Sequence, residues 1–353
     1  MIKPRTNTLN LQAEMLNNER RILCFEAGSS FFVFVMEGGR IVRYFVKQYP
    51  YTVGDIYVGK VQKILEGVGG AFVEFLPGET GYLPCHKMHK LHVLNRLGDG
   101  LKCEDEILVQ IHKEPFGEKK PMLSGKIQGV SKELIEEVLG RAKHTLPKTK
   151  LYAALSEFEK YIKEYPVRAE DKIYGDTKES ADYLASLQGL RDNYTADELL
   201  YNDSRISLME LYGIRGKLHS LLSRKVENAS GVSIVIDHAE ALTAIDVNSA
   251  HYDKKRTREE AILEINMEAA KECIYQIQAR NITGMILIDF INMKSEEYNN
   301  MLLANLQELG EKCSPPLHVI DLTKLGIIEC TREKQAENLA FYKETIYKTI
   351  LTE

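Results

Sequence analysis

The sequence has few cysteines, and no two of them are closely spaced. Six cysteines are scattered over 353 residues without a CxxC pair. Zinc ribbons need such pairs, and disulfide scaffolds are short chains dense in cysteine. We therefore expect reduced, mostly structural thiols, and neither a zinc ribbon nor a disulfide framework.

Long hydrophobic runs and excess positive charge are missing as well. The longest continuous apolar stretch, 31–36, is far shorter than the roughly 20 residues of a membrane helix, and the first twenty residues lack the apolar core of a signal peptide. A net charge of −5 does not indicate a general nucleic-acid binder, so any RNA surface must be local. With 44% hydrophobic and 27% charged residues, the composition indicates a globular cytoplasmic protein of two or three units with no membrane partner.

Residues 233–293 contain two apolar, strand-like runs that each carry a carboxylate near the end. Strand alternation places Asp246 and Asn248 on the same side of the first run. The second run is apolar except for Asp289, and the residues between the runs, 258–280, have helical periodicity. We interpret this as a βαβ unit with parallel strands, whose two aspartates meet beyond the carboxyl ends of the strands.

Two carboxylates without a neighbouring cysteine or histidine favour a hard cation such as Mg²⁺. The implied chemistry is phosphoryl transfer or phosphodiester hydrolysis. The alternative is that each aspartate is simply a turn or helix-capping residue. Asp237 and Asp321 also end apolar runs; Asp237 lies at a hairpin turn, at the opposite end from Asp246, and Asp321 is a third candidate.

Three strings carry a resemblance to a known family: SIVIDHAEALTAIDVNSAH, TREEAILEINMEAAKECIYQIQARNITGMILIDFINM and DLTKLGIIECTREK. They resemble the catalytic core of the ribonuclease E/G family of bacterial endoribonucleases. The resemblance implies that Asp246 and Asp289 hold Mg²⁺ and that Asn248 positions the attacking water or the scissile phosphate. It also implies cleavage of single-stranded RNA to 5′-phosphate and 3′-hydroxyl ends.

The same resemblance implies the fold class, an α/β chain with a DNase I-like catalytic core, a ribonuclease H-like subdomain and an inserted S1 β-barrel. The barrel corresponds to 51–127, where short strands alternate with glycine-rich turns, as in an OB-fold. Phe72 and Tyr82 match the aromatic residues that stack on bases, although they could instead fill the barrel core. The lysines that could reach phosphates are Lys60, Lys113 and Lys120.

The remaining ranges complete the expected organisation: an N-terminal arm (1–20), a ribonuclease H-like scaffold (21–50 with 166–232), a helical region (128–165) and a catalytic domain (233–353) that ends in a helix over 333–350. Relatives recognise a 5′-monophosphate with an Arg-Thr pair that is missing between 127 and 200, so we expect little dependence on the RNA 5′ end. They also carry a CPxC zinc link that is absent here, so any homodimer must form without it.

Two further features have open interpretations. His86, His89 and His92 are evenly spaced and could form a metal site, but a solvated loop is the alternative. Arg332 matches a basic residue near the family's active site and could touch phosphate, or it could be a solvated residue. As a whole, the chain could also be an RNA-binding protein with a degenerate nuclease core, or a phosphoryl-transfer enzyme for small substrates.

Overall fold

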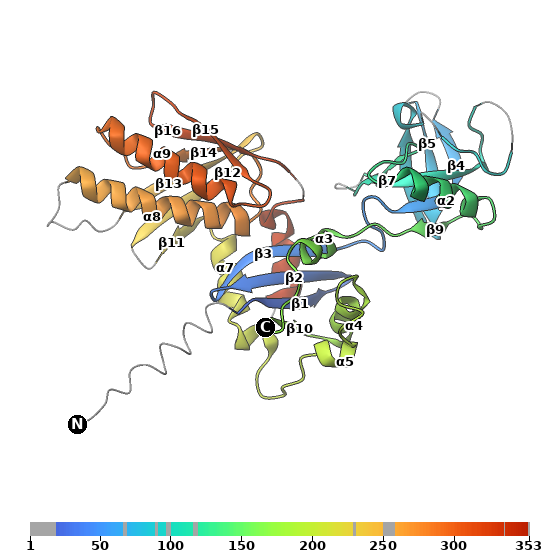
Figure 1. Cartoon of the computed structure of the whole chain (residues 1–353), viewed down its shortest axis with the longest axis horizontal. Coiled ribbons are helices and arrows are strands. Elements are labelled where there is room, and N and C mark those ends of the chain that lie inside the picture. The colour runs from blue at the N-terminus through green and yellow to red at the C-terminus, as the bar shows by residue number, and fades with distance from the viewer. Residues whose placement is uncertain are drawn as a thin grey trace. The chain divides into compact units, whose positions relative to one another are not determined.

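The computed structural model describes residues 19–65, 69–88, 91–96, 100–115, 119–228, 231–249, 258–334 and 336–351. The predicted arm, except for its last two residues, and His89 lie outside these ranges. The chain divides into two compact units, one of which joins Met1–Lys47 to Val167–Glu353, while the other is Gln48–Pro166. The secondary structure is mixed α/β, as predicted (Figure 1).

The second unit contains a closed five-stranded barrel. Its strands are β4 (Ile56–Leu65), β5 (Gly70–Leu76), β6 (Glu79–Pro84), β7 (Glu106–Lys113) and β8 (Met122–Ser124). They pair in the order β5-β6-β8-β7-β4, and a further β4–β5 pairing closes the ring. All pairs are antiparallel except β6–β8, which is parallel. This is the topology of an OB-fold, and it confirms the predicted barrel.

The helical region predicted over 128–165 contains two helices, but a strand separates them. The chain forms α2 (Lys132–Ala142), then the strand β9 (Thr149–Tyr152), then α3 (Glu157–Glu164). β9 pairs with β4, and Leu151 is buried against Val58 and Leu108 of the barrel, where Val138 of α2 also packs. Because Leu151 is the one buried residue of β9, the sequence lacks the alternation of apolar and polar residues that predicts a strand. The strand is evident only from its pairing with β4 at the edge of the barrel.

The first unit contains a four-stranded sheet with the order β10-β1-β2-β3. Its strands are β1 (Arg21–Ala27), β2 (Ser30–Glu37), β3 (Arg40–Lys47) and β10 (Lys172–Gly175). The ring of Phe31 stacks on Tyr183 of α4 (Lys178–Ser186), with 4.7 Å between centroids. Alternate residues, including Phe32 and Phe34, pack on helices and on the C-terminal segment.

Two predicted helices of this unit differ from the structure. The sequence of 207–225 predicts one helix. In the structure Gly213, whose φ of 58° is left-handed, interrupts it, and the chain forms α6 (Leu208–Leu211) and α7 (Ile214–Leu222). The C-terminal helix begins at Leu339 instead of 333, as η2 (Leu339–Tyr342), α10 (Lys343–Thr345) and the π-turn η3 (Ile346–Ile350). The segment is held because Leu339, Ile346 and Ile350 are buried against the four-stranded sheet.

The same unit also contains a six-stranded sheet with the order β11-β12-β13-β14-β16-β15. Its strands are β11 (Lys225–Glu227), β12 (Val232–His238), β13 (Leu242–Ser249), β14 (Gly284–Asp289), β15 (Leu317–Leu322) and β16 (Ile327–Arg332). The helix α8 (Arg258–Ala279) connects β13 to β14, which run parallel, so the predicted βαβ unit is confirmed.

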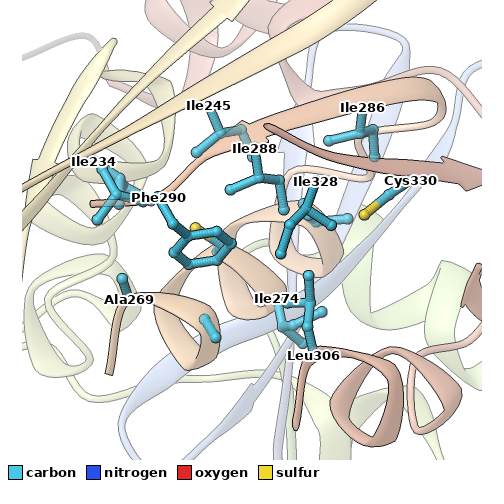
Figure 2. Packing of buried hydrophobic residues seen from close by; sticks show 14 of the residues in the cluster. Ile234, Ile245, Ala269, Ile274, Ile286, Ile288, Phe290, Leu306, Ile328 and Cys330 are labelled. Atoms are coloured by element: carbon cyan, nitrogen blue, oxygen red, sulfur yellow. The ribbon is translucent and has the colours of Figure 1, made fainter. Parts of the chain in front are cut away.

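One face of the six-stranded sheet is covered by α8 and by α9 (Glu296–Glu311) (Figure 1). Figure 2 shows how side chains from neighbouring strands, among them Ile245, Ile288 and Ile328, gather against Ile274 of α8 and Leu306 of α9. Because side chains alternate along a strand, the residues between them point to the opposite face. On that face the described side chains are mostly exposed or half-buried. None of the described helices is long and apolar enough to span a bilayer.

Candidate functional site

Asp246 and Asp289 are register partners in the adjacent parallel strands β13 and β14. Neighbouring strands lie roughly 4.8 Å apart, so the two carboxylates project side by side from the same face of the sheet. Both side chains are exposed, and both lie at or near the carboxyl ends of their strands. The structure therefore brings together the two aspartates that the sequence pattern paired.

Asn248 lies two residues beyond Asp246 on the same face of β13. Its Nδ2 donates a hydrogen bond to Oδ2 of Asp246 at 2.6 Å. The backbone of Asn248 pairs with Ser233 of β12, whose side chain is buried. The amide thus fixes the rotamer of one carboxylate, and Asp246, Asn248 and Asp289 form one polar group at the end of the sheet.

The segment that follows Asp289 is held by α8. The fully buried Asn266 donates from Nδ2 to the carbonyl of Ile291 at 2.8 Å and accepts from the N–H of Ile291 at 3.1 Å. The carboxylate of Glu259 accepts from the backbone N–H of Lys294 at 3.1 Å. Asn266 is not among the residues predicted from sequence, although a polar residue on the apolar stripe of a helix is a visible signal.

The two other strand-end aspartates have different partners. Asp237 forms a bidentate ion pair with Arg224, with N–O distances of 2.5 and 2.6 Å, and this pairing lowers the pKa of Asp237. Asp321 is the register partner of Glu329, on strands beyond β14 in the sheet, and its Oδ1 accepts from the N–H of Leu322. Neither joins Asp246 and Asp289.

The donor set suits a hard cation. Two carboxylates and a carboxamide supply only oxygen ligands, and Mg²⁺ is commonly held by one or two carboxylates, with water and substrate phosphate completing its shell. In the described part of the chain, no three His, Cys, Asp or Glu side chains gather as a closed metal site. The residues present therefore fit an ion that substrate and water help to coordinate, and do not form an all-protein cage.

Phe72 and Tyr82 lie opposite each other on β5 and β6, on the outer face of the barrel. Their ring centroids are 5.9 Å apart and the rings are tilted by 56°. Both side chains are half-buried, whereas the barrel core is formed by other residues, including Val61 and Val73. Gly70 makes room for the ring, because a Cβ there would lie 2.5 Å from Cε2 of Tyr82.

The strand register extends this pair into a longer row. Lys63 of β4 is opposite Phe72, Met122 of β8 is beside Tyr82, and Lys113 of β7 is opposite Met122. Lys63 and Lys113 are exposed. The barrel therefore carries a row of two rings and a methionine with a lysine at each end, which we call the aromatic row. Lys63 and Met122 were missed because sequence alone does not give the register of these strands.

The remaining predicted lysines differ in their surroundings. Lys60 forms an ion pair with Glu104 at 2.5 Å, and its register partner is Glu74. Lys120 is exposed two residues before Met122. Lys120 therefore lies close along the chain to the aromatic row, whereas Lys60 is paired with Glu104. His86 and His92 are exposed.

The prediction that Arg332 touches phosphate is wrong. Its side chain is 3% exposed, and its guanidinium donates to the carbonyls of Pro315, Ile282 and Ser314 and to Oδ1 of Asn281, at 3.0–3.1 Å. Burial lowers the pKa of this arginine. These bonds tie the end of β16 to two loops, so Arg332 stabilises the sheet.

Known proteins that are similar to this chain include ribonucleases. A family model described as "Ribonuclease E/G family" matches residues 115–335, which include Asp246, Asn248 and Asp289. Ribonuclease G of Haemophilus influenzae is 24% identical, over 81% of this chain and 73% of its own. A ribonuclease E/G-like protein of Pyropia yezoensis is 26% identical, over 85% and 73%. Ribonuclease E of a Nostoc species is 26% identical, over 82% of this chain and 52% of its own.

Proposed function

Because the chain belongs to the ribonuclease E/G family, we propose that it is an endoribonuclease that cleaves single-stranded RNA beside Asp246 and Asp289. The observation that carries this proposal is the register pairing of the two carboxylates on adjacent parallel strands. Ligand sites of open α/β sheets lie beyond the carboxyl ends of strands, where this pair is found.

A divalent cation, Mg²⁺ by its preference for hard oxygen ligands, would be held by Asp246 and Asp289. When bound, such an ion supplies Lewis acidity at the scissile phosphate. Asn248 keeps the carboxylate of Asp246 in place through its 2.6 Å hydrogen bond and presents its amide to the phosphate or to the attacking water. Hydrolysis in which water attacks phosphorus and the 3′-oxygen leaves would give 5′-phosphate and 3′-hydroxyl ends.

The aromatic row would supply the affinity for RNA. Aromatic rings on a barrel surface stack on unpaired bases of any sequence, and lysines attract the backbone. Phe72 and Tyr82 offer two adjacent rings, and Lys63 and Lys113 flank them. This arrangement supports a preference for single strands, because paired bases cannot turn their faces to the rings.

The domain assignment follows from these roles. We assign 51–127 as the S1 domain that binds RNA, 233–353 as the catalytic domain, and 21–50 with 166–232 as a ribonuclease H-like scaffold. Residues 128–165, predicted as a separate helical region, form part of the same compact unit as the barrel.

The test replaces each aspartate by asparagine, which removes the negative charge and keeps the shape of the side chain. Asp246→Asn and Asp289→Asn should reduce cleavage of a labelled single strand to background, as should EDTA with the parent, while RNA affinity stays within a few-fold. Asp237→Asn is the matched control, since this aspartate lies on the same sheet but pairs with Arg224, and it should cleave normally. Parent-like cleavage by either site variant would refute the assignment, and a parent that binds RNA without cutting it would indicate a binding protein instead.

A further inference from the structure

A pocket of about 240 Å³ opens directly after Asp289, between the segment that follows β14 and the turn between β15 and β16. The buried side chains of Phe290, Leu302 and Ile328 form its apolar lining. The polar residues around it include Asn292, Asn299 and Lys324. The pocket therefore begins one residue after Asp289 at the end of the sheet, on the side that the helices cover, and it combines an apolar surface with carboxamides.

The walls of this pocket are fixed by hydrogen bonds. On one side, Asn266 holds the backbone of Ile291. On the other, the 323–327 turn is closed by a bond from the N–H of Thr323 to the carbonyl of Ile327 at 2.9 Å. Gly326, with φ of 85°, fits this turn closely, because a Cβ there would lie 2.6 Å from Oδ1 of Asn292. The pocket is thus preformed, which lowers the cost of binding.

The turn presents two unusual side chains. Lys324 is exposed and forms no ion pair or hydrogen bond with any residue in the described ranges. The neighbouring Leu325 is 81% exposed although the turn is well fixed. The sheet face beside them is acidic, because Asp289, Glu329 and Asp321 are exposed there. An available cation on an acidic surface, next to an exposed apolar side chain, suits a ligand that is anionic on one side and apolar on the other; the exposed Lys294, which follows the pocket residue Met293, adds a second positive charge.

We propose that this pocket receives the unstacked base of a nucleotide adjacent to the scissile phosphate, while Lys324 contacts a neighbouring phosphate. The volume is below the roughly 300–1,000 Å³ of pockets for drug-sized ligands, which suits one base. Single-stranded RNA is commonly read by bases splayed into such sites, where carboxamides bond the base edge. The Nδ2 of Asn299 donates to the carbonyl of Met293 at 3.3 Å, so its Oδ1 is the atom of this amide that can accept a bond from a base, and Asn292 supplies the second amide.

This inference rests on the proposed function, and it predicts selectivity at one position of the substrate. The experiment measures cleavage of a single strand in which each nucleotide near the cut is replaced in turn by an abasic one. For the parent, one position should lower kcat/KM by about tenfold, the loss expected for one stacked base. In Asn292→Ala the same abasic substitution should have a smaller effect, because the base edge has already lost a partner.

Lys324→Ala provides a variant that keeps the fold, because this side chain is exposed at the tip of a turn. It should lower kcat/KM on every sequence and leave the pattern of abasic sensitivity unchanged. The matched control is Lys312→Ala, an exposed lysine at the end of α9 far from the pocket, which pairs with Glu308 and should cleave as the parent does. An equal loss in both lysine variants would overturn the role of Lys324.

The outcomes separate the two proposals. A parent that cuts no RNA refutes the proposed function. A parent that cuts RNA but shows no abasic-sensitive position, or one whose sensitivity is the same in Asn292→Ala, retains the function and refutes the base pocket. Urea midpoints of the variants within experimental error of the parent show that the comparison concerns the pocket and not the fold.

Discussion

Replacing Asn266 by alanine should destabilise the catalytic sheet and disturb the segment behind Asp289. The amide of Asn266 is fully buried and exchanges two hydrogen bonds with the backbone of Ile291, at 2.8 and 3.1 Å. Truncation leaves one carbonyl and one N–H without partners. A fully buried orphan costs about 1–3 kcal/mol, and Ile291 is half-buried, so the free energy of unfolding should fall by about 2–4 kcal/mol.

Urea denaturation of the full chain, followed by circular dichroism, measures this loss. Asn305→Ala is the matched control, because this asparagine lies on α9 and its buried Oδ1 accepts no hydrogen bond from any described residue. The control should lose about 1 kcal/mol or less. Cleavage by Asn266→Ala should also slow while RNA affinity is retained, since Asp289 is two residues from Ile291. If the two variants are equally stable, Asn266 does not hold this segment.

Three further predictions concern the barrel, the buried arginine and an acidic residue. Phe72→Ala or Tyr82→Ala should weaken single-strand binding in fluorescence anisotropy by about 1–3 kcal/mol per stacked base; unchanged binding by folded variants would leave the rings a packing role. Arg332→Ala should lower the urea midpoint with RNA affinity unchanged, and the reverse result would contradict the burial argument. Burial alone would raise the pKa of Asp171, but a backbone N–H and the Arg20 guanidinium hold it below the ordinary 3.8. The ionised carboxylate of Asp171 therefore stabilises the fold above pH 3.8, and this stabilisation is lost as the carboxylate is protonated at lower pH. The stability difference between the parent and Asp171→Asn should shrink between about pH 5 and pH 2.

The sequence predicted the paired aspartates because two local regularities are sufficient for that inference. Strand alternation and the parallel βαβ rule together place Asp246 and Asp289 at one edge. The burial of Arg332 could not be predicted, because its partners come from two loops that are distant along the chain. The positions of Lys63 and Met122 depend on which residues of four strands face each other, and this register is set by packing of the whole barrel.

The charges are distributed so that RNA affinity and RNA cleavage depend on different residues. The salt dependence of RNA binding measures this difference. The sheet face around the two aspartates is acidic and repels a polyanion, so the electrostatic part of RNA binding must come from lysines such as those of the aromatic row. For single strands, log K falls with log salt by about 0.7 for each phosphate contact. Lys113→Ala should therefore reduce that slope by about 0.7. Lys60→Ala should change it little, because Glu104 already pairs with this lysine. Anisotropy titrations of the two lysine variants at several salt concentrations measure these slopes. Equal changes in slope would show that the barrel attracts RNA through its general charge and not through the aromatic row.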